Sequence, residues 1–197
     1  LTRTVKLMSE VSVVRRRRKT RRLPLAPREP SLDARSVKAV LIGASTGGPP
    51  VLQTVLSGFH AGFPAPILVV QHITKGFIEG MLEWLGAAIS LPVSLARDGE
   101  RALPGRVYFA PDDHHMGIDA SGRFFLSMDA PENGIRPSIS FLFRSALASY
   151  GAEVVAVLLT GMGKDGAEEM KRIRDAGGVT IIQDKESSVV YGMPGEA

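Results

Sequence analysis

The sequence of 197 residues contains no cysteine. Disulfide bonds, thiolate catalysis and cysteine metal sites are therefore excluded. The sequence also lacks any apolar run approaching the roughly 18 residues that a membrane-spanning helix needs, and its start has no apolar stretch typical of a signal peptide. These absences predict a cytoplasmic protein without membrane insertion. Because the first residue is Leu1 rather than methionine, we expect a fragment of a longer chain.

Positive charge is concentrated at the start of the chain. Residues 1–30 contain ten Lys/Arg and two Glu, a net charge of +8, whereas residues 31–197 carry a net charge of −4. The basic run at 15–22 could be a nucleic-acid arm. It has no interleaved aromatic residue on which bases could stack. We therefore interpret it as a solvated linker and expect no nucleic-acid partner.

The chain divides into a short leading segment and one folded domain. Apolar residues recur at helical spacing at the start, namely Leu1, Val5 and Met8, and three prolines between positions 24 and 30 favour an extended linker. Residues 1–36 are thus predicted to be a terminal helix and a basic linker. Residues 37–197 are predicted to form the domain.

Apolar runs and helical spacings alternate along this domain. Strands are predicted at 37–43, 66–72, 154–159 and 179–183, and helices at 49–57, 77–89, 138–148 and 167–176. Between them lie short strands at 92–96 and 106–110, followed by a hairpin signal at 116–128. The pattern predicts an α/β fold: a doubly wound, mostly parallel sheet with helices on both faces and an antiparallel edge hairpin.

The turn after the first strand carries a candidate nucleophile. Gly43-Ala44-Ser45-Thr46-Gly47 fits the G-x-S-x-G nucleophile elbow, in which a serine sits between a strand and a helix. The same glycines could instead hold a dinucleotide phosphate on the helix N-terminus. That alternative requires an acidic residue at the end of the second strand, where this chain has Gln71-His72, and the loop has no Walker lysine. Nucleotide binding is therefore the weaker hypothesis.

Three predicted strands end in groups that could act together: Ser45, His72 and Asp165. Because the carboxyl ends of parallel strands share one edge of the sheet, the three side chains can converge. A serine becomes a nucleophile when a base removes its proton, and a carboxylate orients that base. A set of Ser45 with Asp98 and His115 is the alternative from the residues alone.

Two further features allow more than one interpretation. The cluster Asp112-Asp113-His114-His115 could bind a metal, but we interpret it as a polar surface loop, place His60 at the surface and expect no metal or cofactor. The second glycine-rich loop, residues 160–166, could be a plain turn or could aim backbone N–H groups at an oxyanion. Spacing alone does not separate these two.

A series of short motifs recurs in order along residues 37–197. They are Gly43-Ala44-Ser45-Thr46-Gly47-Gly48, Gln71-His72, Asp98-Gly99-Glu100, Ala110-Pro111, His115-Met116, Arg136-Pro137-Ser138, Leu159-Thr160-Gly161-Met162-Gly163-Lys164-Asp165-Gly166 and Tyr191-Gly192-Met193-Pro194. Together they resemble the catalytic domain of the CheB-type protein-glutamate methylesterases of bacterial chemotaxis. The family's α/β doubly wound fold agrees with the pattern above.

The resemblance implies an activity and a set of site residues. It implies a hydrolase that acts on methyl-esterified glutamates of chemoreceptors and deamidates receptor glutamines. By motif match, Ser45 is the nucleophile, His72 the base and Asp165 its orienting acid. The backbone N–H groups of Thr46 and Met162 correspond to the oxyanion hole. The histidine of the His115-Met116 pair is present in the family without being its base.

The resemblance also implies partners and a longer chain. The substrate would be the methylated cytoplasmic helices of chemoreceptors. Family members carry an N-terminal receiver domain, phosphorylated by a histidine kinase, and residues 1–36 resemble its last helix and linker. The family continues past Met193-Pro194, so the resemblance implies a domain truncated at its C-terminus.

Overall fold

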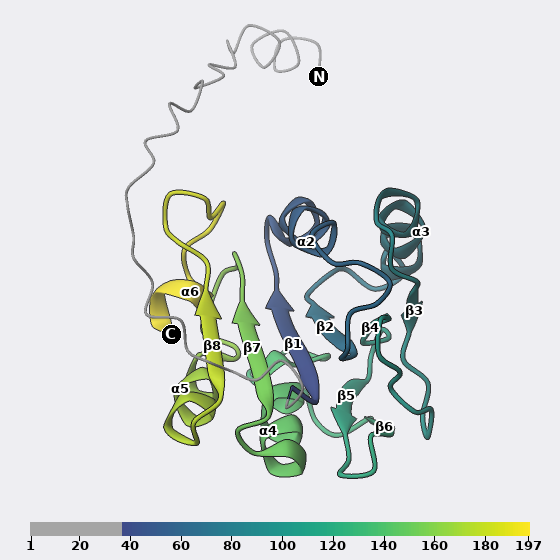
Figure 1. Cartoon of the computed structure of the whole chain (residues 1–197). Coiled ribbons are helices and arrows are strands. Elements are labelled where there is room, and N and C mark those ends of the chain that lie inside the picture. Colours follow the sequence, from purple (N-terminus) through teal and green to yellow (C-terminus); the bar gives the residue numbers. More distant parts are fainter. Residues whose placement is uncertain (1–36) are drawn as a thin grey trace, which may run out of the picture. The chain divides into compact units, whose positions relative to one another are not determined.

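A computed structural model of the chain describes residues 37–197. The expected terminal helix and basic linker in residues 1–36 lie outside the described residues. The described part contains a six-stranded sheet and a separate two-stranded sheet, with helices packed against the larger one (Figure 1). The predicted α/β fold class is confirmed.

The larger sheet is parallel throughout and has the order β3-β4-β2-β1-β7-β8. Its strands are β1 (Ala39–Ala44), β2 (Ile67–Gln71), β3 (Val93–Leu95), β4 (Val107–Phe109), β7 (Val154–Leu158) and β8 (Val179–Ile182). The connection from β1 runs to β2 on one side, and the later strand β7 lies on the other. Such a switch point leaves a crevice at the carboxyl ends of the strands, where open α/β sheets bind ligands.

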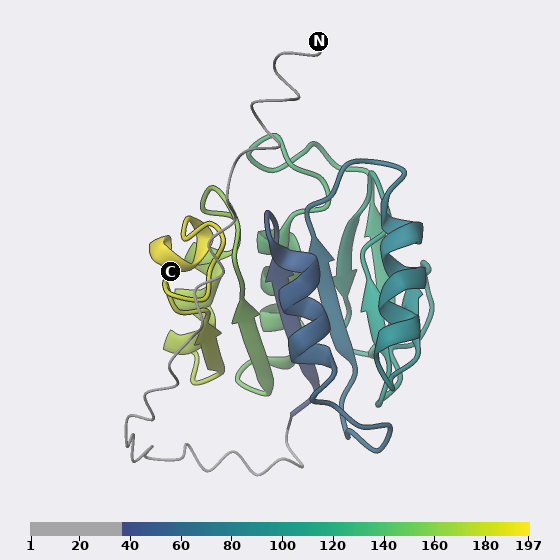
Figure 2. The same ribbon diagram turned by 90° about the horizontal axis from the view of Figure 1, so that it is seen from above.

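Helices cover both faces of this sheet. On one face lie α2 (Gly48–Leu56) and α3 (Ile78–Ala88), which stand in front of the strands in Figure 2. On the other lie α4 (Ile139–Tyr150), α5 (Ala167–Asp175) and the hairpin of β5 (His115–Ile118) and β6 (Phe124–Ser127). Each face buries its own apolar cluster, as a sheet between two layers of helices requires.

The middle of the chain refines the prediction. The predicted antiparallel hairpin is present, but β5 and β6 pair with each other in a separate sheet and do not extend the edge of the six-stranded sheet, which ends at β3 and β8. It packs on α4, where Ser145 Oγ accepts from Ile118 N and Ser149 Oγ donates to Ile118 O. The strands β3 and β4 belong to the parallel sheet, a pairing that short apolar runs do not reveal. A short helix, α6 (Met193–Glu196), was not predicted.

Within residues 37–197, no helix has both the length and the apolar character that crossing a bilayer requires.

Candidate functional site

Ser45 lies in the turn directly after β1 and is partly exposed. Its backbone N–H donates to Thr160 O at 3.0 Å, which joins the first glycine turn to the loop after β7. Gly161 packs against the serine, since a Cβ atom there would stand 2.6 Å from Ser45 Cβ. A side chain at position 161 would therefore separate the two loops.

His72 follows β2, next to the end of β1. Its backbone N–H donates to Ala44 O at 2.9 Å, the last bond of that strand pair. Its ring Nε2 lies 2.9 Å from Asp165 Oδ2. A carboxylate only accepts, so Nε2 carries the proton and Nδ1 is left as the acceptor. Among the hydrogen bonds of residues 37–197, none joins Ser45 Oγ to His72.

The carboxylate of Asp165 is buried, with 4% of the residue exposed. It accepts from Ile139 N at 2.7 Å, from Ser140 N at 3.0 Å and from Ser138 Oγ at 3.0 Å. Residues 138–140 are the N-cap and first turn of α4, whose N–H groups have no partner within the helix. The positive end of the helix dipole thus faces a carboxylate that also holds His72.

These hydrogen bonds decide the charge of Asp165. Burial raises the pKa of its carboxyl group, but the hydrogen bond with His72 and the backbone N–H groups of Ser140 and Ile139 outweigh burial and lower the pKa to about 2. The carboxylate is therefore ionised at neutral pH. An ionised acid at this position is what an orienting partner for a histidine requires.

The lowered pKa predicts an acid-sensitive part of the stability. The pKa of Asp165 lies below the unfolded value of 3.8. Its contribution is therefore present above about pH 4 and is lost as pH falls toward about 2, by on the order of 2 kcal/mol. Denaturant unfolding of the chain and of Asp165→Asn from pH 6 to pH 2 measures it. The difference in unfolding free energy should shrink over this range, and a constant difference would contradict the assignment.

Glycines let α4 come close enough to reach Asp165. A Cβ atom at Gly43 would stand 2.5 Å from Ile139 Cγ2, and one at Gly166 would stand 2.6 Å from the same atom. The first residue of α4 therefore packs directly on β1 and on the turn before α5. These two glycines make room for protein side chains.

Protein side chains also fill the space beside Gly47 and Gly48, the other glycines of the first turn. A Cβ atom at Gly47 would stand 2.5 Å from Val189 Cβ, and one at Gly48 would stand 2.1 Å from Gln71 Oε1. Gly47 also has φ +81°, which favours glycine. Side chains of the chain itself thus fill the space that a phosphate cradle would need, which weakens the nucleotide hypothesis.

Thr46 follows Ser45 in the first turn, Met162 follows Gly161 in the loop after β7, and both residues are exposed. Within residues 37–197, neither backbone N–H donates a hydrogen bond. Thr160 Oγ1 lies 3.0 Å from Thr46 O and accepts from Val190 N at 2.9 Å, so it ties both segments to the loop after β7.

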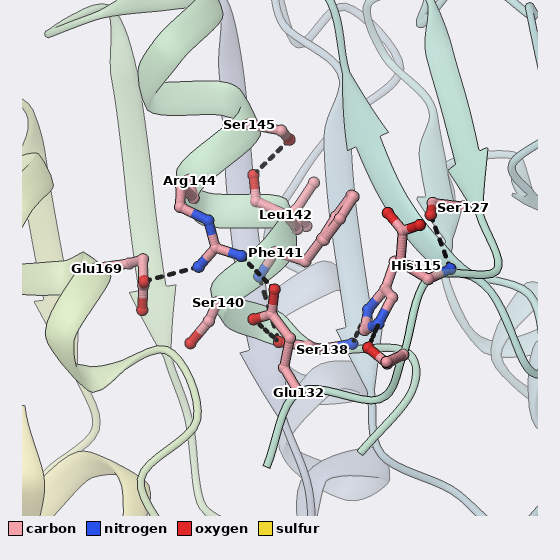
Figure 3. Close-up of polar contacts among 12 residues, drawn as sticks. His115, Ser127, Glu132, Ser138, Ser140, Phe141, Leu142, Arg144, Ser145 and Glu169 are labelled. Atoms are coloured by element: carbon pink, nitrogen blue, oxygen red, sulfur yellow. Dashed lines mark hydrogen bonds and ion pairs between the residues drawn. The ribbon is translucent and has the colours of Figure 1, made fainter. Parts of the chain in front are cut away.

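The alternative set of Asp98 and His115 does not assemble around Ser45. His115 is fully buried and its Nδ1 accepts from Ser138 N at 3.2 Å (Figure 3). Its ring also stacks on Phe141 at 4.7 Å between centroids. Asp98 Oδ1 accepts from Leu126 N in the hairpin. His115 therefore supports the N-terminus of α4.

Because His115 supports α4 and His72 binds Asp165, substitutions of the two histidines should have different effects. His115→Ala should lower the unfolding free energy by about 2–4 kcal/mol, because it leaves a cavity and an unpaired N–H. Activity per folded molecule should stay within about tenfold. His72→Ala should remove nearly all activity. Thermal unfolding and turnover of both variants test this, and near-total loss in folded His115→Ala would make His115 the base.

A polar network that sequence reasoning missed lies beside Asp165. Arg144 pairs with Glu132 and, at 3.0 Å, with Glu169, as Figure 3 shows. Glu132 Oε2 lies 3.2 Å from Ser138 Oγ, which also lies 3.0 Å from Asp165 Oδ1. From the sequence, Ser138 was predicted only as the start of a helix. Its place in the Arg136-Pro137-Ser138 motif was the available signal.

The residues of the cluster Asp112-Asp113-His114-His115 form separate hydrogen bonds and ion pairs. Asp112 accepts from Gly76 N, Asp113 pairs with Lys75, and His114 Nδ1 lies 2.8 Å from Asp112 O. In the described part of the chain, no group of three or more His, Asp or Glu is placed to hold a metal ion. His60 is exposed, as expected.

A cavity of about 870 Å³ opens beside α3 and the hairpin. Its lining includes Ile78, Arg97 and His114, and does not include Ser45, His72 or Asp165. The cavity is thus separate from the candidate site, which lies at the carboxyl ends of β1, β2 and β7.

The fold and site define a doubly wound α/β protein with a serine, a histidine and a buried aspartate gathered at the switch point of its sheet. The family model of the CheB methylesterases matches residues 40–197. The chain belongs to the CheB methylesterase family.

Individual relatives agree with this assignment. A protein-glutamate methylesterase/protein-glutamine glutaminase of Geobacter metallireducens is 54% identical over 98% of this chain and 56% of its own length. One of Syntrophus aciditrophicus is 52% identical over the whole chain and 58% of its own length. The CheB methylesterase catalytic domain of Thermotoga maritima is 42% identical, with a TM-score of 0.78 over 81% of this chain and 86% of that domain. The chain spans little more than half the length of these two longer relatives.

Proposed function

We propose that the chain is a serine hydrolase that removes methyl groups from glutamyl methyl esters of chemoreceptors in chemotaxis adaptation. One observation carries the proposal: the buried, ionised Asp165 forms a hydrogen bond with His72. His72 follows β2, the strand that pairs with β1, and Ser45 follows β1. Relatives named protein-glutamate methylesterase/protein-glutamine glutaminase support the substrate class. Those names also support a second activity, deamidation of receptor glutamines.

In the first half of the reaction, Ser45 Oγ attacks the carbonyl carbon of the methyl ester while His72 Nδ1 takes its proton. Before the transfer, Asp165 keeps the neutral ring in the tautomer with its proton on Nε2, and afterwards it stabilises the imidazolium. The oxygen of the tetrahedral intermediate accepts from Thr46 N and Met162 N. The proton then passes to the departing methoxy group, methanol leaves, and an acyl-enzyme remains.

In the second half, water attacks the acyl carbon and His72 takes its proton. The tetrahedral intermediate collapses, the proton on His72 passes to Ser45 Oγ, and the carboxylic acid that forms is released and loses its remaining proton to water. With a glutamine substrate the first leaving group is ammonia. Neither half needs a cofactor, because the nucleophile, base and oxyanion donors all belong to the chain.

The proposed partners follow from the family resemblance. The substrate is the methylated cytoplasmic helix of a chemoreceptor. In a longer chain, a receiver domain phosphorylated by a histidine kinase would regulate the site.

The test is direct. The chain is incubated with a receptor cytoplasmic fragment that carries methyl-esterified glutamates, and methanol release is followed. Ammonia release from a fragment with glutamine at the same positions tests deamidation. Absence of both would overturn the proposal. Micromolar binding of NAD or ATP in calorimetric titration would revive the rival role of the Gly43–Gly48 turn.

A further inference from the structure

Gln71 is a polar residue in an apolar position. Alternate residues of β2, Ile67 and Val69, belong to the core on the α2 face, and Gln71 continues that register. Only 3% of the residue is exposed. Its Oε1 is buried and, within residues 37–197, has no hydrogen-bond partner. Burying an unpaired acceptor costs stability, so an apolar residue would suit the fold better here.

The amide nitrogen of Gln71 joins the two strand ends that carry the nucleophile and the base. Nε2 donates to Ser45 O at 2.9 Å and to His72 O at 2.8 Å. Both bonds lie beyond the last ladder bond between the strands, His72 N to Ala44 O. We propose that Gln71 is a positioning residue that orients the Ser45–Thr46 peptide for oxyanion binding. This inference rests on the proposed function.

The argument follows from the geometry of a trans peptide. The carbonyl and the N–H of one peptide unit point in opposite directions. When Gln71 Nε2 and Gly48 N, the latter at 2.8 Å, hold the Ser45 carbonyl from the α2 side, the Thr46 N–H points away from α2. Donation to the carbonyl also polarises the peptide and strengthens its N–H as a donor. Gln71 therefore acts on an oxyanion through Thr46.

Gly48 makes room for this arrangement. A Cβ atom there would stand 2.1 Å from Gln71 Oε1 and 3.0 Å from the Cβ of Ala44. Gly48 is the first residue of α2, where alanine would otherwise favour the helix over glycine. Gly48→Ala should thus displace the Gln71 amide without changing its chemistry.

The experiment compares Gln71→Met, which keeps the length of the side chain and removes its two donors, with the unchanged chain. Gln53→Met on α2 is the matched control, because Gln53 is partly buried and outside the site. We expect Gln71→Met to lower kcat for methanol release by about 10- to 100-fold with KM within about twofold. Its Tm should change little, because the loss of the two Nε2 hydrogen bonds is offset by removal of the unpaired Oε1. Gln53→Met should keep kcat within about twofold.

A second readout does not depend on turnover. The ¹⁵N resonance of Thr46 reports hydrogen bonding at the preceding carbonyl, and it should shift in both Gln71→Met and Gly48→Ala. An unchanged Thr46 resonance, or an unchanged kcat in folded Gln71→Met, would overturn the inference. If the unchanged chain releases neither methanol nor ammonia while the Thr46 resonance shifts as expected, the proposed function is wrong. The orientation of the Ser45–Thr46 peptide by Gln71 is then still supported.

Discussion

Replacement of Ser45 by alanine should abolish methanol release, with kcat lowered by about 10⁵- to 10⁶-fold. The reason is chemical: without Oγ no acyl-enzyme forms, and water must attack the ester directly. The effect on stability should be small, because within residues 37–197 Ser45 Oγ makes no hydrogen bond. Turnover of the methylated receptor fragment and thermal unfolding measure the two effects separately.

The matched control is Ser57→Ala. Ser57 is an exposed serine at the end of α2, and its Oγ donates only to Gln53 O of its own helix. This variant should retain full activity. Trapping the acyl-enzyme by rapid acid quench and mass spectrometry should place the adduct on Ser45 in the unchanged chain. Sustained turnover by Ser45→Ala, or an adduct on another residue, would refute the assignment of Ser45 as the nucleophile.

Asp165→Asn should lower kcat by about 10³- to 10⁴-fold. An asparagine amide has one acceptor oxygen for the donors that now surround the carboxylate: His72 Nε2, Ile139 N and Ser140 N. Its NH₂ group must face at least one of them. When the NH₂ group faces His72, the imidazole loses the tautomer that leaves Nδ1 free for Ser45. In either orientation, the imidazolium of the transition state loses its counter-ion.

A suitable control is Asp119→Asn. Asp119 Oδ1 also accepts backbone N–H bonds, from Ser121 and Arg123, but on an exposed turn of the hairpin. This variant should keep its activity. The measurements are kcat, KM and the free energy of unfolding for both variants. If folded Asp165→Asn stays within tenfold of the unchanged kcat, Asp165 only holds α4 and is not the orienting acid.

The periodicity of the sequence was enough for the fold class, because buried parallel strands and amphipathic helices have distinct spacings. The strands at 37–43 and 154–159 were predicted close to their observed bounds. The pairing of β3 with β4 was not predicted, because an apolar run of three to five residues does not indicate which strand it pairs with. The hairpin was found from its turn, but its packing on α4 depends on contacts distant in sequence.

The candidate residues Ser45, His72 and Asp165 came from the sequence, because strand ends of a parallel sheet must share one edge. The tertiary structure decided what surrounds them. It placed the N-terminus of α4 on Asp165, made His115 a support of that helix, and set the amide of Gln71 between two strand ends. Sequence alone determines which groups lie at that edge. Their charge and orientation depend on hydrogen bonds from segments distant in the chain, and only packing brings those segments together.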